Sequence, residues 1–376
     1  MEMTRRQRFY NTVTHGYVDR QIFDLCGCPQ TLILCEQTAR DMKQLLGIDG
    51  TDSGGYLDER ILQKLDIDTR LTGGFPVPKS CHTEKHPGGF TDEWGIGYSL
   101  VGGHYEITKN PLRGMNIDEI RKYPFPRAED IPAKVYRQYA DHARYLHEQT
   151  DYVIVAQHPC YGVFELGCWM FGFDDFLCRC AAEPETVVWF FEKILSYQKG
   201  VIKPYYEALG RYIHCTTSGD DFGTQRGMFM SLSMFKQLIA PFFSERIAYT
   251  KSFTDAFFQH HTCGSVFELI PTLIQCGVDI LNPIQPGAAQ MEPEKLKNEY
   301  GDKLVFWGGI DTQELLVNGS VEEVKSAVAD ILRLFGNTGG YILSPAHCIQ
   351  DDVPAANIIA IYDGAREFYG NQTKGV

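Results

Sequence analysis

Two side chains that bind metals well follow an apolar run in the stretch FFQHHTCGSVFELI (257–270). His261 and Cys263 are two positions apart, so on an extended chain they point to the same side. Gly264 lets the backbone turn sharply directly after the thiol. Imidazole nitrogen and thiolate sulfur are zinc ligands, and this pair supplies half of a Zn²⁺ site. Two ligands alone are weak evidence, and the spacing leaves open that both are hydrogen-bonded core residues.

Further polar side chains stand just after the end of other apolar runs: His158, Asp220, Asp221, Asn282, Gln285, Asp311, His347 and Cys348. Adjacent residues cannot easily face one point, so His347 and Cys348 are alternatives for a third ligand. Asp220 and Asp221 suit acid–base work, substrate binding or the orientation of a metal-bound histidine. A helix cap or a turn explains these two residues as well, and the same holds for Asp311.

The elements that must position these residues are six short apolar runs after residue 150. They are YVIVAQ (152–157), RYIHCTT (211–217), DAFFQHH (255–261), VDILNPI (278–284), KLVFWGG (303–309) and GYILSPA (340–346). Long helical patterns separate most of them, as in SVEEVKSAVADILRLFG (320–336), where Ser320 and Glu323 predict a capping box. Strands that are apolar on both faces and alternate with helices predict a parallel sheet covered by helices.

Six such units, with room for two more, predict an α/β fold of the (β/α)8 barrel type. An open doubly wound sheet is the alternative, but neither G-x-G-x-x-G nor G-x-x-x-x-G-K-[ST] follows any of the runs. In a barrel the polar residues named above converge on the C-terminal face, where the βα loops form the active site. Their shared position therefore predicts an enzyme.

The first part of the chain is irregular and rich in glycine and proline. We assign residues 1–115 to an N-terminal extension or cap of the same domain, and residues 116–376 to the barrel. Within the extension, GYSLVGGHYEI (97–107) predicts a short hairpin around Gly102 and Gly103.

Composition restricts the class of protein. The chain has 376 residues, 44% of them hydrophobic, and a net charge of -13 without a Lys/Arg-rich run, so nucleic acid is not an expected partner. The start MEMTRRQRFYNTVTHG lacks an apolar core, and no apolar run of about 18 residues occurs, which favours a cytoplasmic protein without a membrane segment. The 12 cysteines are then reduced thiols rather than a disulfide framework. The sequence leaves the oligomeric state open, a homodimer included.

Several motifs, in the same order along the chain, resemble the uroporphyrinogen decarboxylase superfamily. They are THGYVDR, TDEWGIGY, SGDDFGTQRGMFMSLSMFKQLIAP, HHTCGSVFELIPTLIQCGVDILNPIQP, FWGGIDTQELL and SPAHCIQDDVPAANIIAIYDGAREFYG. The resemblance extends from about residue 10 to about residue 370. It is closest to the branch of cobamide-dependent methyltransferases and implies a (β/α)8 barrel.

Two chemistries compete within this superfamily. Its decarboxylases use no metal and hold their substrate with an N-terminal arginine cluster, but this chain has VDRQIFDLCGCPQT at that place, without the cluster. The methyltransferases carry H-x-C-G after a middle strand and a cysteine after the last one. His261 and Cys263 match the first motif, and His347 or Cys348 takes the second position. The place of a glutamate ligand in related methionine synthases falls on Gln285, a poorer ligand.

The resemblance thus implies a zinc-dependent methyltransferase that moves a methyl group between a corrinoid protein and a small partner molecule. The donor or acceptor would be a thiol, a folate or a methyl ether, and the corrinoid would be supplied by the partner protein. We assign catalytic roles to Asp220, Asp221 and Gln285, and substrate contacts to His158, Asn282, Asp311 and Trp94. A metal-free lyase of the decarboxylase type, or a non-catalytic barrel that binds a corrinoid or another ligand, is the alternative.

Overall fold

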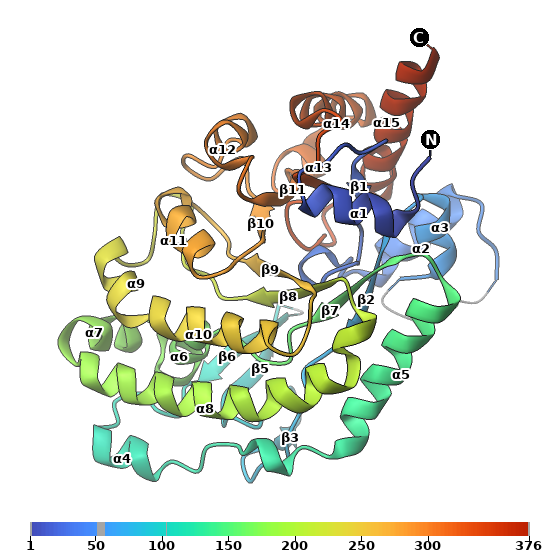
Figure 1. Cartoon of the computed structure of the whole chain (residues 1–376). Helices are drawn as coiled ribbons and strands as arrows, with labels where there is room; N and C mark the ends of the chain where they lie inside the picture. The colour runs from blue at the N-terminus through green and yellow to red at the C-terminus, as the bar shows by residue number, and fades with distance from the viewer. Residues whose placement is uncertain (1, 51–56, 103, 375–376) are drawn as a thin grey trace.

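The computed structural model describes residues 2–50, 57–102 and 104–374, and at its centre lie eight parallel strands (Figure 1). Their hydrogen-bonded order is β1-β12-β11-β10-β9-β8-β7-β2. The strands are β1 (Ile22–Phe23), β2 (Thr69–Gly73), β7 (Val153–Gln157), β8 (Cys215–Gly219), β9 (Phe257–His261), β10 (Ile280–Ile284), β11 (Val305–Ile310) and β12 (Tyr341–Pro345). All six runs predicted after residue 150 form strands, β7 to β12, and the (β/α)8 barrel is confirmed.

The barrel closes between its first two strands through one aspartate. The backbone N–H of Asp68 donates to the carbonyl of Phe23 over 2.9 Å, and the N–H of Phe23 donates to the Asp68 carboxylate over 2.8 Å. Both strands precede residue 116, so the predicted start of the barrel at that residue is wrong. The apolar pattern did not predict these two strands, because β1 has only two residues and β2, TRLTG, is largely polar.

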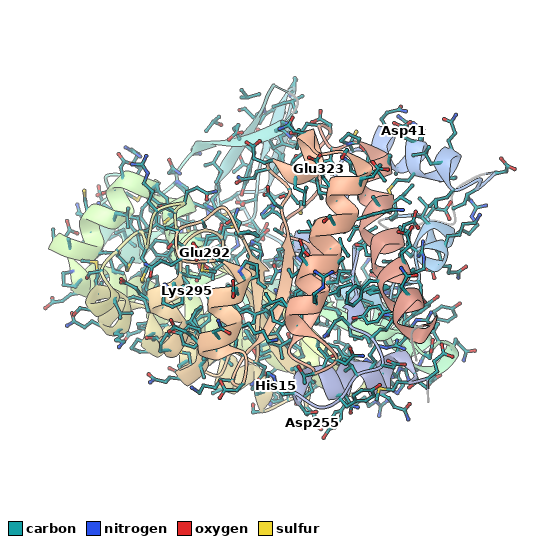
Figure 2. All side chains as sticks on the ribbon, turned by 90° about the horizontal axis from the view of Figure 1, so that it is seen from above. His15, Asp41, Asp255, Glu292, Lys295 and Glu323 are labelled. Atoms are coloured by element: carbon teal, nitrogen blue, oxygen red, sulfur yellow. The ribbon has the colours of Figure 1, made fainter. Side chains whose placement is uncertain are left out.

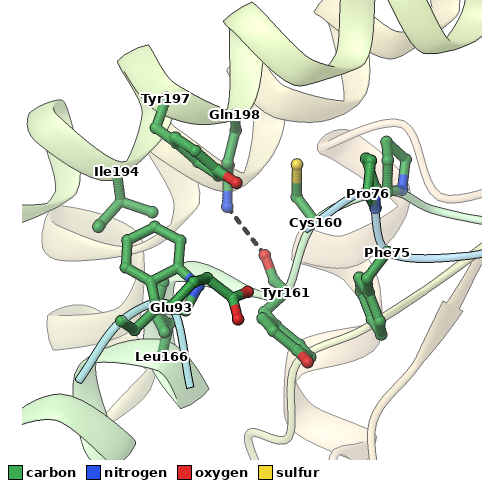
Figure 3. A pocket seen from close by; sticks show the side chains of 11 residues that line it. Phe75, Pro76, Glu93, Cys160, Tyr161, Leu166, Ile194, Tyr197 and Gln198 are labelled. Atoms are coloured by element: carbon green, nitrogen blue, oxygen red, sulfur yellow. Dashed lines mark hydrogen bonds between the residues drawn. The ribbon is translucent and has the colours of Figure 1, made fainter. Parts of the chain in front are cut away.

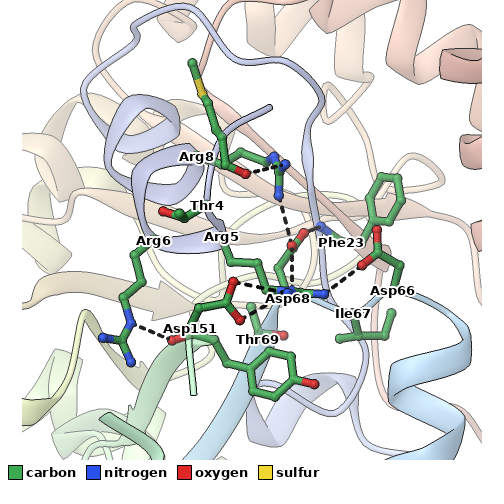
Figure 4. A network of polar contacts seen from close by, with 12 residues as sticks. Thr4, Arg5, Arg6, Arg8, Phe23, Asp66, Ile67, Asp68, Thr69 and Asp151 are labelled. Carbon is green, nitrogen blue, oxygen red and sulfur yellow. Dashed lines mark hydrogen bonds and ion pairs between the residues drawn. The ribbon is translucent and has the colours of Figure 1, made fainter. Parts of the chain in front are cut away.

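Arg5, Arg8 and Arg20 surround this closing aspartate, and Figure 4 shows Arg5 and Arg8 beside it. Asp68 is fully buried, and Arg8 and Arg20 approach its carboxylate to 3.2 and 2.6 Å. Arg5 adds ion pairs with Asp66 and Asp151. The aspartates precede β2 and β7, so the network ties α1 (Arg5–Val13) to the N-terminal ends of these strands. A buried carboxylate needs such partners to remain charged.

Helices cover the outside of the barrel, and α8 packs against α5 and α10 (Figure 1). The main covering helices are α5 (Ala133–Gln149), α8 (Pro184–Leu209), α10 (Ala240–Lys251), α11 (Ile270–Gln275), α12 (Pro293–Tyr300), α14 (Val321–Phe335) and α15 (Ala355–Lys374). Ser320 and Glu323 form the predicted capping box of α14. The exposed carboxylates Glu292 and Glu323 lie on this outer layer (Figure 2). Among the described residues, no helix is long and apolar enough to cross a membrane.

Further helices complete the fold. They are α2 (Glu36–Leu45), α3 (Glu59–Lys64), α4 (Ile117–Lys122), α6 (Val163–Phe171), α7 (Phe173–Ala182), α9 (Leu232–Leu238) and α13 (Leu315–Asn318). Helix α6 matters for the site because it begins shortly after β7, at the end of the barrel where the strands terminate.

A separate antiparallel sheet lies between β2 and β7 in the chain. Its strands are β3 (Glu84–His86), β4 (Gly89–Thr91), β5 (Gly97–Val101) and β6 (His104–Lys109), paired in that order. The predicted hairpin is confirmed as β5 and β6, with Val101 opposite His104, while Gly103 lies outside the described residues. The sheet extends the hairpin by two strands that the sequence did not predict.

The barrel interior changes from apolar to polar along the strands. The apolar side chains that meet inside include Ile22, Val153, Val155, Cys215, Ile280, Val305, Trp307 and Ile342. Nearer the C-terminal ends, the buried polar side chains Thr217 and Gln259 stand opposite each other in paired register. The next inward position on β9 after Gln259 is His261, so the polar interior leads directly to the predicted metal ligands.

Candidate metal centre

Three predicted ligands meet at the C-terminal end of the barrel. One nitrogen from each of His261 and His347 and the Sγ of Cys263 all lie within 4.8 Å of one another. The Nε2 of His261 is 3.2 Å from the Sγ of Cys263, and the ring centroids of His261 and His347 are 5.4 Å apart. Ligands at zinc bond lengths around one tetrahedral ion lie roughly 3.3–3.8 Å apart. The arrangement is therefore close to that of a preformed three-ligand site.

A neighbouring strand fixes the orientation of His261. Asn282 of β10 pairs in register with His261, and its Oδ1 lies 2.5 Å from His261 Nδ1. The Asn282 amide group in turn donates to the carbonyl of Trp307. With Nδ1–H used by Asn282, the lone pair of Nε2 points towards Cys263, as metal binding requires. Asn282 is fully buried and orients His261, while its predicted substrate contact stays a prediction.

Two further predicted residues hold the turn that carries Cys263. The N–H of Cys263 donates to the Asp221 carboxylate over 2.7 Å, and the N–H of Gly264 donates to Gln285 Oε1 over 2.7 Å. Gly264 has a φ of 80°, and a Cβ there would lie 2.5 Å from the Thr224 carbonyl oxygen. Burial, followed by the Asp221 charge, raises the pKa of the Cys263 thiol. The site thus holds a neutral thiol that a bound cation would deprotonate.

The two candidates for the third ligand face different ways. His347 belongs to the cluster, while the Sγ of Cys348 donates to the carbonyl of Pro29 over 3.2 Å. Burial and the neighbouring His261 lower the pKa of His347 to about 4, against the opposing effect of Asp221. His347 is therefore a neutral imidazole near pH 7, which is the form that binds a metal.

The adjacent aspartates have different surroundings. Asp220 is fully buried and accepts hydrogen bonds from the N–H groups of Phe164 and Glu165, so it caps α6. Burial raises its pKa to about 7, although the buried Arg246 opposes the shift. The Oδ1 of Asp221 is 3.8 Å from the Nε2 of His261, so Asp221 lies beside the metal cluster. Asp220 thus caps a helix, whereas Asp221 lies at the candidate site.

Glu165 is a carboxylate beside the site that the sequence did not reveal. It lies in the first turn of α6, and burial raises its pKa well above the ordinary value, with Asp221 and Asp220 adding to the effect. An acidic residue in a first helical turn is ordinary because it complements the helix dipole. The sequence therefore gives no sign of this residue, because only the folded chain brings Glu165 near the two aspartates.

Three predicted substrate residues lie apart from the cluster. His158 is buried, with its ring nitrogens 3.1 Å from the Cys160 carbonyl and from the Thr250 hydroxyl. Asp311 accepts from the N–H groups of the residues that lead into α13, which is a capping role. Trp94 is buried and lines a small cavity that none of the three metal ligands lines (Figure 3). The structure does not bring these three side chains to the metal ligands.

The family model described as "Uroporphyrinogen decarboxylase (URO-D)" matches residues 94–368. The chain belongs to this family. The match includes every strand from β7 to β12 and all three residues of the metal cluster. The residues that match the family model therefore include the part of the barrel that carries the candidate site. No curated protein matches the chain closely enough to count as a relative.

The solved structures that are similar to this chain have low sequence identity to it. A methyltransferase from Methanosarcina mazei aligns with a TM-score of 0.68 and 14% identity, over 98% of this chain and 100% of that chain. A putative vitamin-B12 independent methionine synthase from Listeria monocytogenes gives a TM-score of 0.44 at 12% identity, over 94% and 99% of the two chains. Xylanase 10B from Thermotoga maritima gives 0.41 at 11%, over 66% and 83%. The first similarity supports the barrel fold over the whole chain.

Proposed function

We propose that this chain is a zinc-dependent methyltransferase that moves a methyl group between a corrinoid carried by a partner protein and a small thiol, folate or methyl ether. The observation that carries the proposal is the convergence of His261, Cys263 and His347 at the C-terminal end of the barrel. Active sites of (β/α)8 enzymes lie at this end. The proposal agrees with the family match and with the methyltransferase name of the similar structure.

The donor set fits catalytic zinc. Two imidazole nitrogens and one thiolate are ligands that zinc prefers, and three protein ligands leave a fourth position for a reactant. Gln285 uses its oxygen to hold the Gly264 N–H, so it supports the ligand turn. His261 has an orienting partner in Asn282, as metal-bound histidines usually do.

Zinc in this site would supply Lewis acidity, which lowers the pKa of a coordinated thiol or polarises a methyl ether oxygen. The chain itself contributes the geometry. His261, Cys263 and His347 would hold the ion, and Asn282 keeps Nε2 of His261 facing it. Asp221 and Gln285 fix the Cys263 turn. The buried surroundings of the cluster limit access of water, which strengthens charge interactions with a reacting group.

The structure also bears on the decarboxylase alternative. Arg5, Arg8 and Arg20 pair with aspartates that precede β2 and β7, whereas the metal cluster follows β9 and β12. The start and the end of parallel strands lie at opposite ends of a barrel. These arginines are thus committed to ion pairs at the end opposite the candidate site, which argues against a role in binding an acidic substrate there.

Metal content and methyl transfer test the proposal together. Purified protein should contain about one zinc per chain and should transfer the methyl group of a methylated corrinoid protein to at least one member of a panel of thiols and folates, or catalyse the reverse step from methyl ethers. Cys263→Ala should lose both properties, while Cys348→Ala should keep both. Release of CO₂ from a carboxylated tetrapyrrole by metal-free protein would overturn the proposal in favour of the lyase.

A further inference from the structure

A groove on the outside of the barrel runs between α12 and α14, which are neighbours in the helical layer (Figure 1). We call it the α12–α14 groove and define it by Glu292, Glu294, Ala327, Ile331 and Leu334. It has a volume of about 680 Å³ and is widely open to solvent. None of the three metal ligands lines it, so it is separate from the metal cluster.

One face of α14 forms the floor of the groove. Ala327, Ile331 and Leu334 are spaced i, i+4 and i+7, so they lie on one side of this helix. Ile331 packs against Gly309 of β11, where a Cβ would lie 2.6 Å from the Ile331 Cδ1. Ala327 and Leu334 remain partly exposed. Helix α12 has 8 residues against 15 in α14, so it is too short to cover this apolar face along its length.

Two carboxylates without a cation stand at the end of the groove where α12 begins. Glu292 directly precedes α12 and Glu294 is in its first turn, and both side chains are exposed. Among the described residues, neither forms an ion pair with Lys, Arg or His within 4.0 Å. By contrast, Asp330 on the α14 side pairs with Arg333 over 2.6 Å, so its charge is balanced within the helix.

The lysines of α12 do not balance the charge of Glu292 and Glu294. The Nζ of Lys295 donates to Gln290 Oε1 over 3.0 Å and lies 4.1 Å from the centroid of the Phe267 ring. The Nζ of Lys297 donates to the backbone carbonyl of Leu334, near the end of α14. The groove therefore combines an apolar floor with negative charge at one end.

The open shape of the groove favours a helix over a small molecule as its occupant. Sites for small molecules bury about 70–90% of the ligand surface, which a groove this open does not do. An amphipathic helix buries only its apolar face, and it enters such a groove through apolar residues at i, i+3, i+4 and i+7. Charge complementarity with Glu292 and Glu294 selects a helix with basic residues, because an acidic one would meet like charges.

We propose that the α12–α14 groove binds a basic amphipathic helix of a partner protein. Its apolar face packs on Ala327, Ile331 and Leu334, and its Lys or Arg residues pair with Glu292 and Glu294. The groove lies apart from the metal ligands, so this binding does not depend on methyl transfer. The net charge of -13 attracts any basic peptide, and binding in the groove must therefore be distinguished from this general attraction.

Selection from a displayed library of helical peptides on the full-length protein tests the proposal. Peptides of about 16 residues are long enough to span α14, and the library varies their charged and apolar positions. The enriched peptides should carry apolar residues at helical spacing with Lys or Arg near one end. They should bind the parent protein at least about tenfold more tightly than scrambled peptides of the same composition, as measured by fluorescence polarisation.

Two alanines of α14 provide matched variants. Ala327→Arg places a bulky cation on the floor of the groove, so it should weaken binding of an enriched peptide by about tenfold or more. Ala329→Arg makes the same change on the side of α14 that faces α15, and it should bind the peptide like the parent protein. Thermal unfolding of both variants shows whether they are folded.

The charges are tested by a second pair of variants. Glu292→Gln combined with Glu294→Gln should weaken peptide binding by about three- to tenfold at low salt, and the difference should shrink at high salt. Glu148→Gln combined with Glu322→Gln removes two exposed carboxylates outside the groove and should leave binding unchanged.

Three results would overturn the proposal. The first is enrichment of peptides without basic residues, and the second is equal binding of an enriched peptide to Ala327→Arg and to the parent protein. The third is equal binding of scrambled peptides, which would mean that only the general attraction of an acidic chain is at work. Sedimentation examines the remaining occupant: a parent dimer that Ala327→Arg dissociates would overturn the proposal and assign the groove to a second copy of this chain.

Discussion

The Oδ1 of Asn282 lies 2.5 Å from the Nδ1 of His261, across the paired register of β10 and β9. This contact makes Nδ1 the donor and leaves Nε2 free for a metal. Asn282→Ala should therefore weaken zinc binding by about 10- to 100-fold, which is the usual effect of losing the partner of a ligating histidine. Competition with a chromophoric chelator measures the affinity directly.

Asn357 offers a matched control for this substitution. It is also a buried asparagine, but its amide donates to the carbonyls of Leu316 and Gly319, away from the cluster. Asn357→Ala should lower stability and leave zinc affinity unchanged. Equal loss of zinc affinity in both variants would mean that Asn282 acts only through general stability.

The third ligand can be identified by comparing adjacent residues. His347→Ala should reduce bound zinc well below one equivalent, because a two-ligand site holds the ion weakly. Cys348→Ala should retain about one equivalent, since its thiol points to the Pro29 carbonyl. Elemental analysis after dialysis gives both values. The reverse pattern would show that Cys348 turns towards the metal when the ion is present.

Substitution of Asp220 should mainly lower stability, whereas substitution of Asp221 should mainly weaken metal binding. Asp220→Ala removes the cap of α6 and a carboxylate whose charge interacts with the buried Arg246, so the free energy of unfolding should fall by about 2–4 kcal/mol. Asp221→Ala should change stability by less than about 1 kcal/mol, because the side chain is partly exposed, but should weaken zinc binding. Urea unfolding and zinc titration of both variants test the distinction, and an Asp221 variant with unchanged zinc affinity would contradict it.

The turn after Cys263 requires glycine. Gly264→Ala would strain a residue with a φ of 80° and place a methyl group against the Thr224 carbonyl oxygen, so we expect a loss of about 2–4 kcal/mol and of zinc binding. Gly287→Ala is the control, because a Cβ there meets nothing within 4 Å. Unfolding curves and zinc content of the two variants are the measurements. A stable Gly264→Ala protein with full zinc would show that the turn tolerates a side chain.

Asp24 should make stability depend on pH. It is fully buried inside the barrel, and burial raises its pKa to about 6 despite hydrogen bonds from the side chains of Thr31, Thr69 and Trp307. The folded state holds this proton more tightly than the unfolded chain, so the contribution to stability is largest below about pH 4 and falls as pH rises through about 6. The stability of the parent relative to Asp24→Asn should fall by about 2 kcal/mol from pH 4 to pH 7. Urea unfolding at several pH values tests this, and a constant difference would contradict the expectation.

The sequence predicted the parts of this protein that local pattern determines. The six apolar runs became β7 to β12, and the alternation of an extended chain placed His261 and Cys263 on one side. The choice between His347 and Cys348 depends on the direction of the backbone after β12, which spacing does not reveal. The role of Asn282 depends on the register between β9 and β10, and the proximity of Glu165 to Asp221 depends on tertiary packing. β1 was too short to show a pattern at all.

The antiparallel sheet carries Glu93 and Trp94, whereas the metal ligands come from β9 and β12, more than 160 positions later in the chain. Substitutions in this sheet can therefore change its surface without altering the turn that carries the candidate ligands. A protein could thus keep the His-x-Cys turn unchanged while this small sheet diverges in sequence.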